Sequence, residues 1–335
     1  MAETRMQGIF GATVAGVVDR FKGTAEDKDK VALDDVARLD GQVVLVTGAS
    51  SGLGAGIARR VAELGATTIL AQRSRHEESV AEVVAASGNH DVRALPLDLA
   101  DPASITAFAK RLADEGVVLD RLVCNAGLVP KSARQTAAGI DVMVHVNFLG
   151  NVMLVDALLD HGVLARATGD HARSRIVVVG SEAHRSAPPI DLDNFATPGD
   201  YPTSKVVQHY GRSKLLLHTW AQELSRRLVD ADGTPSVEVH HLCPGAVDSS
   251  LAREAPGWLR PVIGLAFKAF FQEPYAAARP AVWLVASNEV AGQTGVYLHL
   301  DQRKQPADLV LDPATGAALW DRAHELAGRI RTRHP

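Results

Sequence analysis

The 335-residue sequence has few of the features that would place a protein in a membrane, on a nucleic acid or around a metal ion. Its two cysteines lie far apart, without CxxC or CxxH spacing, so neither a disulfide framework nor a zinc site is expected. The net charge of −4 gives no electrostatic basis for binding nucleic acid. No apolar run approaches about 20 residues, the length that spans a bilayer. With 46% hydrophobic residues, the composition indicates a globular protein, which we expect to be cytoplasmic.

The first 40 residues precede any regular pattern and are expected to form an N-terminal extension. Residues 8–18 are apolar and glycine-rich but lack the small-residue cleavage site of a signal peptide. We expect a helix here that packs on the domain or on a partner subunit, with weak attachment to a membrane surface as the alternative. Residues 24–30, TAEDKDK, are predicted to be a charged linker.

From residue 41 onward, short β-branched runs alternate with amphipathic stretches. Near-continuous apolar strands separated by helices indicate a parallel sheet covered on both faces. The prediction is a single α/β domain of the Rossmann-type doubly wound class, with about seven strands, over 41–302, and a C-terminal helical extension over 303–335. The expected strands are 43–47, 67–71, 92–97, 121–125, 175–180, 237–242 and 296–300, and the expected helices are 53–64, 102–115, 135–161, 203–230 and 274–287.

The first predicted strand runs directly into TGASSGLG, residues 47–54, and a predicted helix follows at once. Gly48 allows a tight turn, Gly52 admits a pyrophosphate close to the backbone, and Gly54 lets helix and strand pack closely. The helix N-terminus then offers free N–H groups and a positive dipole end to the phosphates. This context favours dinucleotide binding over a purely structural turn. The expected contacts are Gly48, Ser50, Ser51, Gly52, Leu53 and Gly54.

The choice between NADP(H) and NAD(H) is expected at the end of the second strand. An acidic residue there would bind the ribose 2′-hydroxyl of NAD, whereas an arginine would accommodate the 2′-phosphate of NADP. The sequence has Gln72 and Arg73 at this point, and Arg75 is a second candidate. The planar guanidinium of Arg73 suits a phosphate, so NADP(H) is preferred, with NAD(H) and two ordinary surface arginines as alternatives.

Two further strand ends supply candidate cofactor contacts. Asp98 and the Leu99 backbone follow the third strand, where the adenine ring would lie, whereas Asp101 before Pro102 is predicted to be a helix N-cap. Asn125, Ala126 and Gly127 follow the fourth strand, and their small size would let the backbone approach the cofactor. An ordinary strand-end turn is the alternative for this second segment.

These motifs, together with Tyr210-x-x-x-Lys214 and CPGAVDS at 243–249, resemble the short-chain dehydrogenase/reductase family in order and spacing over roughly residues 40–300. VVVGSEAH before a long insertion, and Leu-Trp at 319–320, resemble its retinol-dehydrogenase-like branch. The resemblance implies a carbonyl–alcohol oxidoreductase that works as a homodimer or homotetramer through the long helices. It further implies cofactor contacts from Pro244, Gly245, Val247 and Ser249.

The resemblance also implies a catalytic set. Tyr210 would exchange the proton, and Lys214, one helical turn away, would lower the tyrosine pKa and bind the nicotinamide ribose. Ser181 would hold the carbonyl oxygen, with a turn or helix-cap serine as its alternative interpretation. Asn147 matches the family's asparagine that orders a water behind the lysine. Ser213, between Tyr210 and Lys214, is expected on the helix surface.

A second pair, Tyr201 and Lys205, has the same spacing as Tyr210 and Lys214. Pro202 follows Tyr201 at once, and a residue before proline is disfavoured in a helix. Tyr210 is therefore preferred as the proton donor.

The substrate is expected to be lipophilic. Residues 248–275, where the family places its substrate lid, are rich in Trp, Phe, Leu and Ile, although packing on the core or on a subunit would explain the same composition. Two other functions were weighed. One is a C=C reductase of the protochlorophyllide type, for which only Cys124 and Cys243 could supply a nearby thiol. The other is a cofactor-binding sensor or scaffold without catalysis. No metal is expected.

Overall fold

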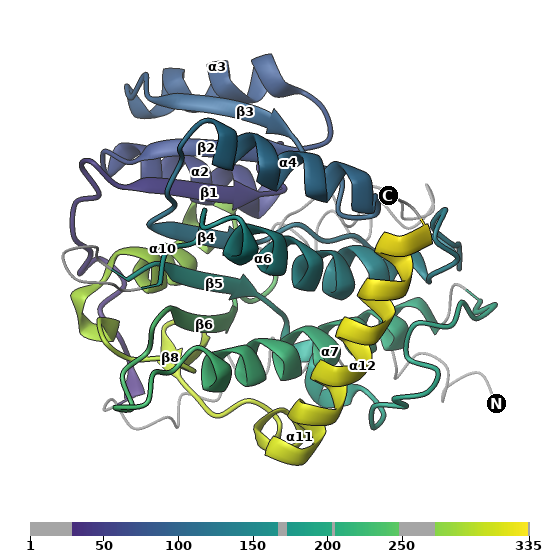
Figure 1. Ribbon diagram of the computed structural model, residues 1–335. Coiled ribbons are helices and arrows are strands. Elements are labelled where there is room, and N and C mark those ends of the chain that lie inside the picture. The colour runs from purple at the N-terminus through teal and green to yellow at the C-terminus, as the bar shows by residue number, and fades with distance from the viewer. Residues whose placement is uncertain (1–28, 167–172, 203–204, 248–271, 334–335) are drawn as a thin grey trace, which may run out of the picture.

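A computed structural model describes residues 29–166, 173–202, 205–247 and 272–333. Their eight strands form one sheet in the order β3-β2-β1-β4-β5-β6-β7-β8 (Figure 1). Seven strands are parallel, and β8 pairs antiparallel with β7. The strands are β1 Val43–Thr47, β2 Thr67–Gln72, β3 Val92–Pro96, β4 Arg121–Cys124, β5 Arg175–Val179, β6 Glu238–Cys243, β7 Tyr297–His299 and β8 Gln302–Arg303.

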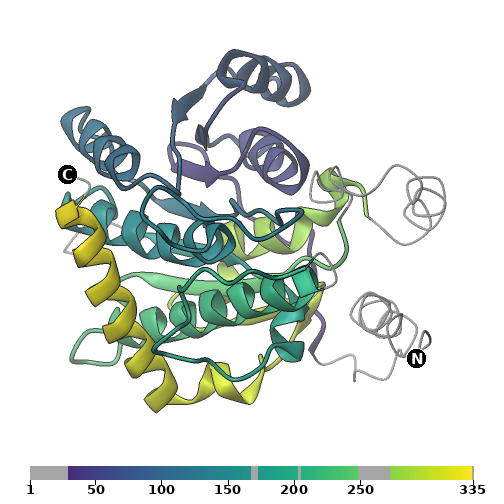
Figure 2. The ribbon, with the colours of Figure 1, turned by 90° about the vertical axis from the view of Figure 1, so that its right-hand side faces the viewer.

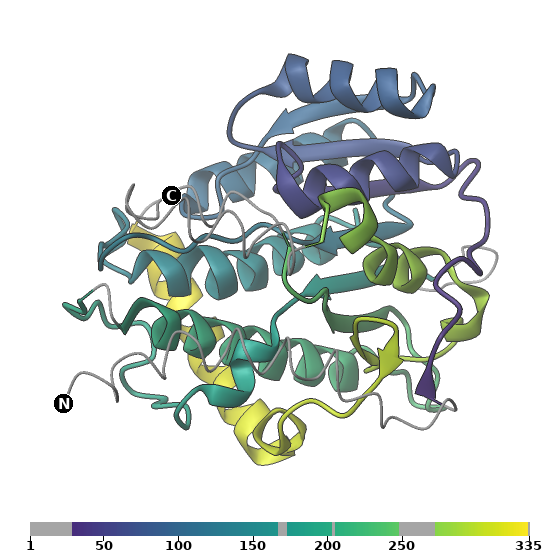
Figure 3. The same ribbon diagram turned by 180° about the vertical axis from the view of Figure 1, so that it is seen from behind.

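The doubly wound fold is confirmed, because helices cover both faces of the sheet (Figures 2 and 3). One face packs against α2, α3 and α10, and the other packs against α4, α6, α7 and α12. The α-helices are α2 Gly52–Glu63, α3 His76–Ser87, α4 Pro102–Asp114, α5 Val142–Val144, α6 Gly150–Asp160, α7 Val206–Arg227, α9 Pro274–Ala277, α10 Arg279–Ala286, α11 Asp308–Leu311 and α12 Pro313–Arg333. Short 3-10 turns span Glu182–Ser186 and Asn288–Val290.

Three predicted helices differ from the observed ones. The stretch 135–161 becomes helical only at Val142, because Asp141 caps the start by accepting the N–H groups of Met143 and Val144. The helix predicted over 203–230 is observed over Val206–Arg227. The helix predicted over 274–287 is two helices that meet at Ala278.

The C-terminal residues pack on the same core as the rest of the sheet. Leu319, Ala323, Ala327 and Ile330 of α12 are spaced by three or four positions and are all buried. Burying one such leucine contributes about 1.5–3 kcal/mol. At the other end, the Val31 N–H donates to the Asp301 carbonyl, so residues around 31 lie along the last strands of the sheet.

One described helical stretch is long and apolar enough to cross a membrane, which corrects the expectation that no run is long enough. It is Val142–Asp160, with a mean hydropathy of 1.7. Its residues pack against the sheet and against α4, and 83% of that window is buried inside the protein. This burial is what a core helix of a globular domain shows.

Five of the buried histidines among the described residues have a lowered pKa. Burial lowers the pKa of His145 to about 4 and that of His241 to about 3. Burial likewise lowers the pKa of His184, His218 and His240. All five are therefore neutral in the folded protein at physiological pH.

These histidines predict a fold that loses stability in mild acid. Above pH 6.5 the rings are neutral in both folded and unfolded chains. Below pH 6.5 the unfolded chain binds protons that the folded core excludes, so each ring lowers the free energy of unfolding by up to about 1.4 kcal/mol per pH unit, until the pH reaches the pKa of that ring in the folded protein. Chemical denaturation at pH 7, 6 and 5 should give a free energy of unfolding that falls steeply.

His240 offers a control for this prediction. Both of its ring nitrogens are buried without a hydrogen-bond partner among the described residues, so His240→Leu should keep or raise stability at pH 7. The same variant should show a shallower acid slope, because one titrating group is gone. Equal stability of the natural protein at pH 7 and pH 5 would contradict the account.

Candidate active site

A cleft of about 340 Å³ opens where β1, β4 and β5 end. Parallel strands bring their carboxyl ends to one edge of a sheet, so Thr47, Asn125 and Ser181 meet there from distant parts of the chain. The described residues of the expected cofactor and catalytic set, apart from Asn147, all line this cleft. They are Gly48, Ser50, Ser51, Gly52, Leu53, Gly54, Arg73, Asp98, Leu99, Asn125, Ala126, Gly127, Ser181, Tyr210, Lys214, Pro244, Gly245 and Val247.

The glycine-rich loop has a geometry that only glycine satisfies at its key positions. Gly48 and Gly52 have φ angles of 68° and 55°, in the left-handed region that side chains disfavour. At Gly54 an added Cβ would lie 2.3 Å from the Gly48 carbonyl oxygen. The loop therefore folds tightly against the start of α2 and leaves its backbone bare toward the cleft. This bare cradle at a helix N-terminus fits the pyrophosphate of a nicotinamide dinucleotide.

Thr47 and Asn125 lock this loop to the end of β4. The Thr47 hydroxyl accepts the N–H groups of Asn125 and Ala126 at 2.9 and 3.0 Å. The Asn125 amide donates to the Thr47 carbonyl at 2.9 Å. Two of the strand ends that form the cleft floor are thus held in register by side chains. Thr47 was not among the residues predicted for the site, although its place at the end of a strand before a glycine loop was a usable signal.

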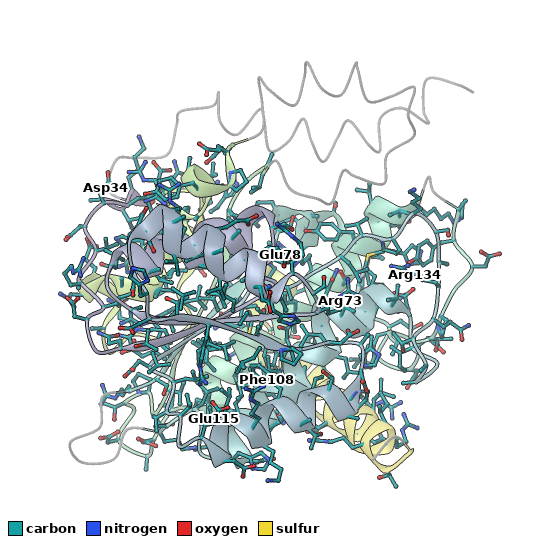
Figure 4. The ribbon with its side chains drawn as sticks, turned by 90° about the horizontal axis from the view of Figure 1, so that it is seen from above. Asp34, Arg73, Glu78, Phe108, Glu115 and Arg134 are labelled. Atoms are coloured by element: carbon teal, nitrogen blue, oxygen red, sulfur yellow. The ribbon has the colours of Figure 1, made fainter. Side chains whose placement is uncertain are left out.

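The end of β2 carries no acidic side chain toward the cleft. Gln72 is buried and donates to the Ser74 and Arg75 carbonyls and to the Ser79 hydroxyl. The Arg75 guanidinium donates to the Ser50 carbonyl and pairs with Glu82, so it holds the glycine loop. Arg73 is exposed at the cleft, at the end of the sheet where the strands finish (Figure 4). Arg73 is therefore better placed than Arg75 to meet a 2′-phosphate.

Ser181, Tyr210 and Lys214 meet at the wall formed by β5 and α7. The Ser181 hydroxyl caps the 3-10 turn after β5 by accepting the Ala183 N–H, and it also hydrogen-bonds Tyr210. The Lys214 ammonium is buried, donates to the Val179 carbonyl at 2.9 Å and lies 5.8 Å from the centre of the Tyr210 ring. Ser181 therefore caps a turn, as the alternative interpretation of this serine expected, and it is also a hydrogen-bond partner of Tyr210.

Burial sets the protonation of this pair. It raises the pKa of Tyr210 to about 12, against the opposing effect of the hydrogen bond from Ser181. It lowers the pKa of Lys214 to about 8. We expected Lys214 to lower the pKa of Tyr210, but the net change of this pKa is upward, because desolvation of the phenolate outweighs the other influences. Tyr210 is accordingly a phenol at neutral pH.

Asn147 lies behind the cleft wall in a π-helical turn, His145–Leu149, between α5 and α6. Single π-helical turns inside α-helices are frequent at functional sites. The Asn147 amide accepts the Leu128 N–H at 2.8 Å and donates to the Leu128 carbonyl and to the Ser213 hydroxyl. It therefore joins the loop after β4 to α7, and its part in a water relay stays a prediction.

We expected Ser213 on the surface of the helix, but the structure places it in the interior. It is fully buried, accepts from the Asn147 amide and donates to the Tyr210 carbonyl at 2.8 Å. The expectation was wrong because α7 is covered by the sheet on one side and by neighbouring helices on the other. Ser213 supports the turn of helix that carries Tyr210.

Tyr201 and Lys205 do not form a second catalytic pair. Tyr201 lies before α7, and its hydroxyl donates to the Asp141 carboxylate at 3.1 Å while its ring stacks on His209. Lys205 is exposed at the start of the helix. The rejection of this pair on the ground of Pro202 agrees with the structure.

Several expected features fall on residues that the structure does not describe. Ser249 lies outside the described residues, as do most of the apolar lid segment, 248–271, the helix expected around residues 8–18 and most of the linker 24–30. The two cysteines are described, and neither lines the cleft. Burial raises the pKa of Cys124 to about 12 and that of Cys243 to about 11, so both are thiols at neutral pH.

The fold and the cleft define a dinucleotide-binding oxidoreductase with a Ser-Tyr-Lys constellation. Residues 42–191 match the family model described as short chain dehydrogenase. The chain belongs to the short-chain dehydrogenase family, in its retinol-dehydrogenase-like branch. As a member it is an oxidoreductase that acts on alcohol and carbonyl groups and uses NAD(P).

Three similar proteins support this placement. Polyprenol dehydrogenase of Mus musculus is 34% identical over 86% of this chain and 84% of its own. Retinol dehydrogenase 14 of Homo sapiens is 32% identical over 89% of both chains. Among solved structures, an active-site complex of Pseudomonas aeruginosa RhlG with NADP is 25% identical, with a TM-score of 0.59, over 80% of this chain and 98% of that one.

Proposed function

We propose that this protein is an NADP(H)-dependent oxidoreductase that interconverts a lipophilic ketone or aldehyde and its alcohol. One observation carries the proposal: a glycine-loop cradle, an arginine at the end of β2 and the set Ser181, Tyr210 and Lys214 share one cleft. The glycine-loop cradle would bind the pyrophosphate of the dinucleotide, and the arginine would bind its 2′-phosphate. Ser181, Tyr210 and Lys214 would deliver a proton beside the nicotinamide.

The side chains divide the chemistry of carbonyl reduction between them. The bound nicotinamide supplies or accepts the hydride. Tyr210, a phenol at neutral pH, donates a proton to the oxygen as negative charge develops on it. Ser181 hydrogen-bonds Tyr210 and would hold the same oxygen. Lys214 is fixed at the Val179 carbonyl, where it would bind the nicotinamide ribose and favour the phenolate left behind.

The protonation of Tyr210 supports the reductive direction at neutral pH. A pKa of about 12 leaves the phenol as the ready proton donor, whereas alcohol oxidation would need the scarce phenolate. A preference for NADP(H) over NAD(H) also supports the reductive direction.

The position of Arg73 supports this preference for NADP(H). Arg73 is exposed at the cleft and has no hydrogen-bond or ion-pair partner among the described residues, so its guanidinium is available to a phosphate.

A lipophilic substrate is supported from two sides. The named activities of the similar proteins, polyprenol dehydrogenase and retinol dehydrogenase, concern isoprenoid alcohols. The cleft that contains Tyr210 is also lined by Leu128, Val146 and Val179, which suit an apolar chain. The aromatic composition of residues 250–272 agrees with this substrate class. Cytoplasmic location, a homodimer or homotetramer, and membrane-surface contact through the first residues stay predictions.

The two other candidate functions lose support. A C=C reductase that relies on a thiol in the cleft is disfavoured, because Cys124 and Cys243 are buried and neither lines the cleft. A sensor without catalysis is disfavoured, because Ser181, Tyr210 and Lys214 meet at the cleft rather than being dispersed.

Tyr210→Phe tests the proton donor. The variant keeps the ring but removes the hydroxyl, so kcat for reduction of retinaldehyde or a long-chain aldehyde should fall by roughly 100-fold or more. The dissociation constant for NADPH should stay within about threefold. Following NADPH absorbance under steady-state conditions measures the first, and fluorescence titration measures the second.

Tyr201→Phe is the matched control, because it removes the hydroxyl of the other tyrosine, which is bound to Asp141 outside the cleft. Its kcat should remain within a few-fold of the natural protein. If Tyr210→Phe turns over as fast as Tyr201→Phe, Tyr210 is not the proton donor.

Arg73→Gln tests the choice of cofactor. Loss of a charged hydrogen bond to the 2′-phosphate costs about 1.5–3 kcal/mol, so NADP(H) affinity should fall roughly 10- to 100-fold while NAD(H) affinity is unchanged. Arg111→Gln is the control, since Arg111 pairs with Glu115 on α4 and does not line the cleft. Isothermal titration with both nucleotides measures the effect. Parallel losses for NADP(H) and NAD(H) would exclude recognition of the 2′-phosphate by Arg73.

A further inference from the structure

The helix that carries Tyr210 and Lys214 continues the same spacing for two more turns. His218 and Gln222 follow at four-residue intervals, so the four side chains run along one side of α7. Tyr210 hydrogen-bonds the Ser181 hydroxyl, and Lys214 binds the Val179 carbonyl. His218 makes the next contact down, because its Nε2 accepts the Ser181 backbone N–H at 3.1 Å. The catalytic serine is therefore approached by α7 at its backbone as well as at its side chain.

Gly180 leaves the space for this contact. A Cβ at Gly180 would lie 2.0 Å from the His218 Nε2, so any side chain there would displace the ring. The backbone of Gly180 is itself tied to the sheet, because its N–H donates to the Leu242 carbonyl at 2.7 Å. The position thus combines a fixed backbone with room for an imidazole directly behind Ser181.

The Ser181 carbonyl is bound by a second histidine. His184 Nδ1 lies 2.7 Å from that carbonyl oxygen, and the Ala307 N–H donates to His184 Nε2 at 3.1 Å. A carbonyl only accepts and an N–H only donates, so His184 must carry its proton on Nδ1. Both backbone hydrogen-bonding groups of Ser181 are therefore held by imidazole rings.

The same logic fixes the proton positions of the ring pair behind His218. Because His218 Nε2 accepts from Ser181, the neutral ring must carry its proton on Nδ1. That proton points to His241 Nδ1, 2.8 Å away, which must accept it. His241 then carries its own proton on Nε2, where the Gln222 carbonyl oxygen accepts at 3.2 Å. The chain from Ser181 to Gln222 has one consistent direction, and a proton added to either ring would set two donors against each other.

The surroundings keep these rings neutral. All three histidines are buried, and the Tyr297 ring packs against each of them with centroids 5.0–5.9 Å apart. Burial lowers the pKa of His218 and His184, and lowers that of His241 to about 3. The charged forms that would break the chain are therefore excluded at physiological pH.

We propose that His218 and His241, together with His184, are positioning residues for the proposed reaction: the rings hold the Ser181 backbone so that its hydroxyl faces Tyr210. This inference rests on the proposed function, because it assigns the rings a part in that chemistry. No ring transfers a proton to substrate. The rings act through Ser181, which they fix between β5 and α7.

His218→Leu and His218→Gln separate positioning from packing. Leucine fills space but leaves the partly buried Ser181 N–H without this acceptor, so kcat should fall roughly 10- to 100-fold, with the NADPH dissociation constant unchanged. Glutamine can place its carbonyl oxygen near the Nε2 position and should restore kcat to within about threefold. Rapid-mixing assays with a lipophilic aldehyde give kcat, and nucleotide titration gives the dissociation constant.

His240→Leu is the matched control. His240 neighbours His241 on β6, is equally buried and lies on the opposite face of the sheet, without a hydrogen-bond partner among the described residues. The control should keep kcat within about twofold. Equal kcat in His218→Leu and His240→Leu would overturn the proposal, as would a failure of glutamine to perform better than leucine.

Nitrogen-15 NMR of the natural protein tests the geometry without any turnover. The proposal requires a protonated Nδ1 in His218 and His184 and a protonated Nε2 in His241, all neutral at pH 7. Any other tautomer in His218 overturns it, even if His218→Leu fails to fold. A natural protein that reduces no carbonyl compound would instead refute the proposed function, and the positioning role in catalysis with it, while correct tautomers would leave the hydrogen-bond chain standing. Normal activity with wrong tautomers would refute the inference alone.

Discussion

Parallel pairing of β4 with β1 on one side and with β5 on the other is the constraint on which the rest of this structure depends. It delivers three strand ends, which are more than fifty residues apart along the chain, to a single edge of the sheet. At this edge the glycine loop supplies a bare backbone, and the Asn-Ala-Gly turn lets the backbone approach a ligand closely. Ser181 supplies a hydroxyl. Thr47 then ties the first two together, so the cleft is rigid where a dinucleotide would lie. Helices on both faces keep the strands buried and make this edge the place where ligands enter.

The second component is α7, which closes the cleft from the side of β5. Its residues contact the strand end at successive turns, from the Tyr210 hydroxyl through the Lys214 ammonium to the His218 ring. Their burial decides their chemistry, because it raises the pKa of the phenol and lowers the pKa of the ammonium and the imidazoles. A protonated tyrosine beside a fixed serine suits proton delivery to a developing alkoxide. The same burial is the reason that we expect the protein to lose stability in acid.

The sequence was sufficient wherever a local pattern carries the information. β-Branched runs located the seven parallel strands, and the glycine loop located the cleft, because both follow from short-range periodicity and turn chemistry. Strand β8 was missed, because it has two residues and so shows no alternation of apolar and polar positions. Ser213 was misplaced and His218 overlooked because their burial and partners arise from packing between α7, β5 and β6. A single sequence does not show which of thirteen histidines will face one another. The net pKa shift of Tyr210 depends on desolvation in the folded protein, so the sequence pattern could not predict it either.

The central claim is direct hydride transfer in this cleft with Tyr210 as the acid. It is tested most directly by a single turnover of the protein loaded with NADPH that carries deuterium at the transferable C4 position, mixed with retinaldehyde. The account predicts that the deuterium appears on the carbon of the product alcohol, more slowly than hydrogen does, and that Tyr210→Phe suppresses the transfer. Product without deuterium from the cofactor, or no product from any lipophilic ketone or aldehyde, would contradict it.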